Sequence, residues 1–196
     1  MSTDDLTVGL ILAGGEGRRV GRRNKGLLAL QGKPLVEHIF ERLSSQVDKV
    51  IISANENIDA YKALVPDVYK DASECVGKGP LAGVYTASQQ LDEHVRFLQV
   101  VPCDTPFIPT NLVIVLKQAL LSNPENEIAY AATPLCDHPS IFLCKTSINR
   151  QLLTHLEQGK LSIKSWLFSH HTIKVLFDDE VAFTNINHLE TLAQYQ

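Results

Sequence analysis

The stretch Val8-Gly9-Leu10-Ile11-Leu12-Ala13-Gly14-Gly15-Glu16-Gly17 joins a continuous apolar run to a cluster of glycines. An apolar run bounded by glycines is typical of a strand that is buried on both faces of a parallel sheet. Directly after it, five basic side chains fall within eight positions: Arg18, Arg19, Arg22, Arg23 and Lys25. The stretch therefore predicts a buried first strand that ends in a basic, glycine-rich loop.

Segments further along the chain alternate between strand-like and helix-like patterns. Apolar runs predict strands at 50–52, 95–101, 128–132, 140–144 and 172–177, with a further short strand at 67–70. Apolar residues at three- and four-residue spacing predict helices at 35–47, 81–91, 111–121, 146–157 and 161–170, and a short last helix from about 187. Pro34 occupies the expected first position of the first helix. Such alternation is typical of right-handed βαβ units.

The predicted fold is a single Rossmann-like, three-layer α/β domain over residues 1–196, with a mostly parallel sheet flanked by helices. We see no internal repeat, linker or low-complexity tract that would divide it. The region Asp137-His138-Pro139-Ser140, which resembles a hairpin, is the part expected to break the parallel order.

Composition excludes several classes of protein. With 196 residues, 44% hydrophobic and 20% charged, the chain has ordinary globular composition. The net charge of −4 argues against a nucleic-acid binder. No apolar run approaches the roughly 18 residues of a membrane span, and the acidic N-terminus does not resemble a signal peptide. The cysteines form no CxxC pair, which favours free thiols and a cytoplasmic location: Cys75, Cys103, Cys136 and Cys144.

The glycine–arginine loop has the composition of an anion site. Ligands of open α/β sheets bind beyond the carboxyl ends of strands, so the loops after Leu12, Ile52, Lys70 and Val101 are expected to lie close together. Glycines let backbone N–H groups approach an anion, and the basic side chains supply charge for phosphate oxygens. Neither the dinucleotide fingerprint nor the P-loop fits this stretch. The alternative is a solvated basic turn.

Two aspartates follow predicted strands. Asp104, bracketed by Pro102 and Pro106, would face the phosphate loop and could hold Mg²⁺, which needs only one or two carboxylates besides phosphate oxygens. The alternative is a cap of the next helix or an Asx-turn. Asp71 could contact a nucleobase edge or a ribose, or cap a helix. His138 could be catalytic, although a single histidine without a partner is more often structural.

These residues resemble a known family. The loop motif Leu12-Ala13-Gly14-Gly15-x-Gly17-x-Arg19-x-Gly21-x-x-x-Lys25-Gly26 is similar to the signature of nucleoside-triphosphate transferases, and within that superfamily to the molybdenum cofactor guanylyltransferase (MobA) family. The likeness covers essentially the whole chain, through Gly32-Lys33-Pro34-Leu35, Gly79-Pro80-Leu81-Ala82-Gly83, Pro102-Cys103-Asp104-Thr105-Pro106, Asp137-His138-Pro139 and Phe183-x-Asn185-x-Asn187. The Gly-Gly after Ala13 resembles the guanylyl rather than the cytidylyl branch.

The resemblance implies transfer of GMP from GTP to molybdopterin carrying molybdenum, with Mg²⁺ as cofactor and molybdoenzymes and other cofactor-biosynthesis proteins as further partners. It implies nucleotide contacts at Leu12, Ala13, Gly14, Gly15, Lys25, Ser53, Asp71 and Asp104. Lys25, Arg19 and Asp104 would be catalytic, with Asp104 as the metal ligand. The pterin would contact Gly79, Gly83, Asn185 and Asn187.

The chain departs from the family pattern at a few positions. Asn24 stands where an aspartate is usual, Arg22 where a second glycine is common, and Ser53 where related enzymes often have an asparagine, with Asn55 two residues on as a substitute. Two other functions stay open: nucleotidyl transfer to another phosphorylated acceptor (cytidylyl transfer to molybdopterin included), and a nucleotide-binding module without turnover.

Overall fold

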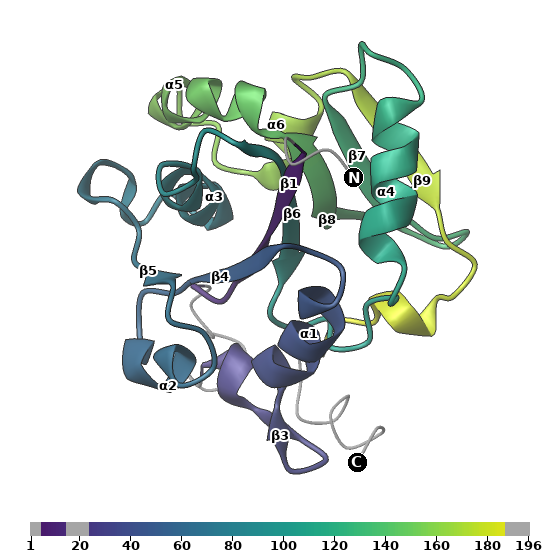
Figure 1. Ribbon diagram of the computed structural model, residues 1–196. Coiled ribbons are helices and arrows are strands. Elements are labelled where there is room, and N and C mark those ends of the chain that lie inside the picture. Colours follow the sequence, from purple (N-terminus) through teal and green to yellow (C-terminus); the bar gives the residue numbers. More distant parts are fainter. Residues whose placement is uncertain (1–4, 15–23, 187–196) are drawn as a thin grey trace.

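A seven-stranded sheet forms the centre of the computed structural model, which describes residues 5–14 and 24–186 (Figure 1). Across the sheet the strands follow the order β5-β4-β1-β6-β8-β7-β9. In chain order they are β1 (Leu6–Leu12), β4 (Lys49–Ser53), β5 (Val68–Tyr69), β6 (Val95–Pro102), β7 (Ile128–Ala132), β8 (Asp137–Lys145) and β9 (Thr172–Leu176).

The sheet is parallel except for β8, which runs antiparallel to both β6 and β7. The reversal begins in the short loop after β7, where the backbone N–H of Thr133 donates to the carbonyl of Cys136 at 2.8 Å. A connection this short can join only antiparallel strands. The mostly parallel sheet and its break at Asp137 are therefore confirmed.

Helices cover both faces of the sheet and confirm the three layers. α1 (Leu35–Ser44) and α4 (Leu112–Leu121) pack on one face, together with Tyr61 of the short helix α2 (Ile58–Lys62). α3 (Pro80–Ser88), α5 (Leu152–Glu157) and α6 (Ile163–Leu167) pack on the other. Neighbouring residues of β1 divide between the two cores, Ile11 facing α1 and Leu10 facing α3. This alternation explains the unbroken apolar run, because both faces of the strand are buried.

Several boundaries differ from the sequence prediction. Pro34 precedes α1 as its N-cap instead of starting it, because it belongs to a small antiparallel hairpin of β2 (Ala29–Leu30) and β3 (Lys33–Pro34). The two turn residues, Gln31 and Gly32, have φ of 52° and 79°, as a two-residue hairpin turn requires. The helix predicted at 146–157 begins as a 3-10 helix (Thr146–Gln151), and that at 161–170 shortens to α6. The predicted last helix lies outside the described residues.

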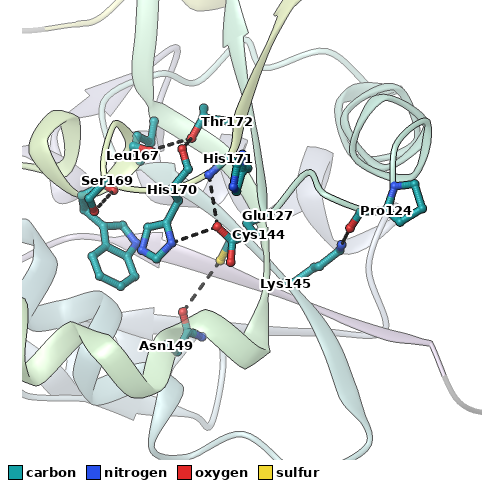
Figure 2. A network of polar contacts seen from close by, with 11 residues as sticks. Pro124, Glu127, Cys144, Lys145, Asn149, Leu167, Ser169, His170, His171 and Thr172 are labelled. Carbon is teal, nitrogen blue, oxygen red and sulfur yellow. Dashed lines mark hydrogen bonds and ion pairs between the residues drawn. The ribbon is translucent and has the colours of Figure 1, made fainter.

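A polar network joins three strands at the amino end of the sheet (Figure 2). The carboxylate of Glu127 accepts a hydrogen bond from the backbone N–H of His171 at 3.1 Å and contacts Nδ1 of His170 at 3.2 Å. Nearby, Lys145 Nζ donates to the carbonyl of Pro124 at 2.7 Å. These bonds fix the start of β7, the end of β8 and the start of β9. They lie at the opposite end of the sheet from the loops predicted to bind ligand.

The part of the chain that the structure describes holds no helix with the length and apolar character that crossing a membrane requires. Its four cysteines are free thiols, of which three are buried and Cys136 is exposed.

Candidate functional site

The carboxyl ends of β1, β4 and β6 meet in the middle of the sheet. Leu12 pairs with Ser53 on one side and with Pro102 on the other. Beyond the strands, the backbone N–H of Ala13 donates to the carbonyl of Ser53 at 2.8 Å, and that of Cys103 donates to the carbonyl of Leu12 at 3.0 Å. The loops that sequence analysis expected to gather are thus held side by side by backbone hydrogen bonds.

Lys25 and Asp104 face each other across this edge. Lys25 begins a short 3-10 helix (Lys25–Leu27), and its Nζ lies 3.4 Å from Oδ2 of Asp104. The two side chains are 22% and 15% exposed. Burial raises the pKa of the Asp104 carboxyl, and the neighbouring Lys25 ammonium partly opposes that rise. The pair therefore brings an acidic and a basic side chain together just past the end of β6, and both are mostly buried.

The predicted alternative role for Asp104, capping the next helix, is not what the structure shows. α4 begins at Leu112 with Asn111 as its N-cap, which makes no side-chain capping bond. The neighbouring Cys103 is buried, and burial raises the pKa of its thiol to about 12. A thiol with this pKa is neutral near pH 7, so Cys103 behaves as a small apolar side chain and not as a nucleophile.

The backbone around Lys25 is set by a buried tyrosine. The Tyr61 hydroxyl donates a hydrogen bond to Oδ1 of Asn24, and Tyr61 is fully buried. A Cβ on Gly26 would lie 2.6 Å from that hydroxyl, so only glycine fits there. Sequence analysis missed Tyr61 because α2 is too short for a periodic apolar pattern. Asn24, which stands where the family usually has aspartate, thus accepts a hydrogen bond from the buried Tyr61.

Asp71 follows β5 and is held by the side chain of Asn55, which follows β4. Nδ2 of Asn55 donates to the Asp71 carboxylate at 2.8 Å, and Oδ1 of Asn55 accepts from the Asp71 backbone N–H at 2.9 Å. Burial raises the pKa of the Asp71 carboxyl, and the bond from Asn55 opposes the rise. Gly14, in the described start of the first loop, lies beside Asn55: a Cβ there would be 3.3 Å from Nδ2.

Ser53 and Gly83 lie in the interior. Ser53 is 2% exposed, and a Cβ on Gly83, in α3, would collide with its hydroxyl. The close packing of α3 against β4 therefore explains why position 83 is a glycine. The carbonyl of Ser53, which accepts from Ala13, is its link to the first loop. The predicted contacts of Ser53 with nucleotide and of Gly83 with pterin stay predictions.

The other predicted pterin residues lie in loops. Gly79 is exposed, has φ of 75° and precedes α3 as its N-cap. Asn185 is exposed, and the next residue, Ile186, donates its backbone N–H to the carbonyl of Asp104 at 2.7 Å. The loop that carries Asn185 therefore runs beside the Lys25–Asp104 pair. Gly15, Arg19 and Asn187, like the other loop arginines, lie outside the described residues.

His138 supports this same loop. Its ring stacks on Phe183 with centroids 4.9 Å apart, and its Nε2 lies 3.2 Å from the Thr133 hydroxyl. Burial lowers the pKa of His138, which favours the neutral ring. These contacts agree with a structural role. Over residues 5–14 and 24–186, no group of three or more His, Cys, Asp or Glu could by itself hold a metal ion.

Comparisons with known proteins agree with the fold. Residues 9–173 match the family described as the MobA-like NTP transferase domain. A molybdenum cofactor guanylyltransferase of Ralstonia pickettii is 39% identical over 201 residues, covering 98% of this chain and 96% of the relative. One of Shewanella pealeana is 37% identical over 179 residues, covering 91% and 88%. The crystal structure of molybdopterin-guanine dinucleotide biosynthesis protein A from Archaeoglobus fulgidus has the same fold, with a TM-score of 0.73 at 22% identity and 96% of each chain covered.

Proposed function

This chain belongs to the family of MobA-like NTP transferase domains, and we propose that it is a molybdenum cofactor guanylyltransferase. It transfers GMP from GTP to the terminal phosphate of molybdopterin that carries molybdenum, and it releases pyrophosphate. The whole chain, residues 1–196, acts as one nucleotidyltransferase domain. The free thiols favour a cytoplasmic location.

The observation that carries this proposal is the Lys25–Asp104 pair. Lys25 comes from the end of the glycine-rich loop and Asp104 from the end of β6, and their side chains meet at 3.4 Å. A nucleotidyl transfer needs a cation for the triphosphate and a carboxylate for a metal at one place. Inactive nucleotide-binding modules have no need of both.

The chemistry requires no general base. A phosphate monoester is already an anion near neutral pH, so the acceptor phosphate can attack the α-phosphorus of GTP directly. Catalysis then consists of in-line positioning and of neutralising charge on the α-phosphate and the leaving pyrophosphate. We assign that neutralisation to Lys25 and Arg19, and the backbone contacts to the nucleotide to Leu12, Ala13, Gly14 and Gly15.

Asp104 fits a divalent metal, and we propose Mg²⁺. A single carboxylate at a strand end would suffice for Mg²⁺, since proteins usually bind this ion through one or two carboxylates together with phosphate oxygens and water. Because the Asp104 carboxyl is largely withdrawn from water, a cation that neutralises its charge is favoured beside it. The backbone carbonyl of Asp104 accepts a hydrogen bond from the backbone N–H of Ile186. When bound, the metal supplies positive charge to the phosphate oxygens of GTP. The residues of this chain orient the carboxylate and hold the ammonium beside it.

The acceptor would approach from the loop at 184–186 and the start of α3. Asn185 lies next to the residue that contacts Asp104, which supports a position for the pterin on that side of the metal ligand. Gly79 offers a backbone without side chain at the start of α3. Together with Asn187 and Gly83, these residues are our proposed pterin contacts.

The test is pyrophosphate release from each of the four NTPs, with and without molybdopterin. We expect release from GTP that depends on the pterin. Pterin-dependent release from CTP instead would indicate a cytidylyltransferase. Release that requires a different phosphorylated acceptor, or no release at all, would contradict the proposal.

A further inference from the structure

The side chain of Asn55 makes two hydrogen bonds to the same residue. Its Oδ1 accepts from the Asp71 backbone N–H at 2.9 Å, and its Nδ2 donates to Oδ2 of the Asp71 carboxylate at 2.8 Å. The two residues follow neighbouring parallel strands, β4 and β5, so the pair spans the edge of the sheet. Just before this pair, the backbone N–H of Ala54 donates to the carbonyl of Tyr69 at 2.9 Å, which holds the ends of β4 and β5 together.

The first of these bonds decides the direction of the second. A backbone N–H can only donate, so the oxygen of the Asn55 amide must face it, and the NH₂ group must face the side chain of residue 71. One carboxylate oxygen of Asp71 is thereby engaged. This contact restricts rotation of the carboxylate and leaves its other oxygen as an acceptor, because an ionised carboxylate cannot donate.

We propose that Asn55 is a positioning residue that fixes the second oxygen of Asp71 as a hydrogen-bond acceptor for position 1 of the nucleotide base, and that this pair selects guanine over adenine and cytosine. The inference rests on the proposed function. Guanine carries an N1–H donor at this position, whereas adenine carries a lone pair on N1 and cytosine one on N3. A fixed acceptor therefore binds guanine and leaves the other two facing an unpaired charge, which is costly in a partly desolvated site.

The location agrees with this role. Gly14 belongs to the loop whose backbone would hold the nucleotide, and it lies against Asn55, where a Cβ would be only 3.3 Å from Nδ2. The pair thus lies beside the start of this loop, whereas Lys25 lies at the end of the same loop and meets Asp104 beyond β6. Base selection and phosphate chemistry would use different side chains.

The test exchanges hydrogen-bond donors and acceptors between the side chains at positions 55 and 71. In Asp71→Asn, Asn55 still donates to the new side-chain oxygen, so the new NH₂ group faces the base and presents a donor in place of an acceptor. In the double variant Asn55→Asp/Asp71→Asn, the new carboxylate at 55 accepts from both the backbone N–H and the side-chain NH₂ of residue 71. The oxygen of residue 71 then faces the base again.

Equilibrium binding of GTP and ATP, measured by calorimetry on the full chain, gives the preference as a ratio of dissociation constants. We expect Asp71→Asn to lower the preference for GTP by about tenfold or more, and the double variant to recover most of it. Asn55→Ala, which frees the carboxylate to rotate, is expected to lower the preference by a smaller factor. Glu56→Ala, an exposed neighbour in the same loop, is the matched control and should change nothing.

A double variant that stays as unselective as Asp71→Asn, while melting like the wild type, would overturn the inference. So would an unchanged preference in Asn55→Ala. These results differ from a failure of the proposed function, which would appear in the wild type itself as transfer that does not prefer GTP or does not need the pterin.

Discussion

The Lys25 ammonium lies 3.4 Å from the Asp104 carboxylate, although 79 positions separate the two residues in the chain. The first belongs to the loop after β1, and the second to the end of the adjacent strand β6. Pairing of β1 with β6 is therefore what assembles the charged centre of the site.

Asp104→Asn should abolish metal-dependent turnover and leave the fold intact. The amide keeps the size of the side chain but removes the charge that a divalent cation requires. We expect a loss of about 100-fold or more in kcat, measured as pyrophosphate release over a range of Mg²⁺ concentrations. Near-normal activity in this variant would exclude Asp104 as the metal ligand.

Lys25→Ala should slow the chemical step. The ammonium is expected to balance charge that develops on the phosphates, so its loss should lower the single-turnover rate at saturating GTP by about 100- to 1,000-fold. Lys33→Ala is the control, because Lys33 pairs with Glu41 on the surface. An unchanged single-turnover rate in Lys25→Ala would rule out a role in the transition state.

Gly26→Ala should destabilise the protein, and Tyr61→Phe should rescue it. The added methyl would lie 2.6 Å from the Tyr61 hydroxyl, and that oxygen is absent from phenylalanine. Tyr61→Phe alone should cost about 1 kcal/mol, since Asn24 loses its hydrogen bond. Urea unfolding of the two single variants and of the double variant measures the coupling. If the two losses simply add, the proposed collision does not occur.

Stability should fall in mild acid partly because of His138. Burial lowers the pKa of this ring below its ordinary value of 6.5. The folded state therefore favours the neutral ring, and this contribution is complete above 6.5 and is lost as pH falls from 6.5 through the folded pKa. His138→Phe keeps an aromatic ring against Phe183 but cannot titrate.

The measurement is urea unfolding of the wild type and of His138→Phe at a series of pH values on both sides of 6.5. The stability lost between neutral and acidic pH should be smaller in the variant. His94→Ala changes an exposed histidine and is the control, which should follow the wild type. Equal losses in His138→Phe and the wild type would show that the ring is not held neutral.

The strands and their carboxyl-terminal loops could be predicted because buried strands leave plain signals. Leu10 and Ile11 face opposite cores, and this double burial produces the apolar run that sequence analysis used. The placement of Asp104 followed from the same pattern, since its strand ends at Pro102. Rules for parallel sheets then brought the loops together without further information.

Other parts of the site could not be predicted because their signals are not periodic. The hydrogen bond of Tyr61 to Asn24 joins helix α2 to a loop that the fold brings beside it, and nothing in either local sequence indicates it. Asn55 was noticed only as a substitute for Ser53, whereas its two bonds to Asp71 depend on the register of β4 with β5. Such pairings are properties of the tertiary structure.

The backbone hydrogen bond from Ile186 to the carbonyl of Asp104 makes completion of the site depend on a segment far along the chain. Lys25 and Asp104 leave the ribosome well before Ile186 does, so a growing chain carries both charged residues before the segment that packs against them exists.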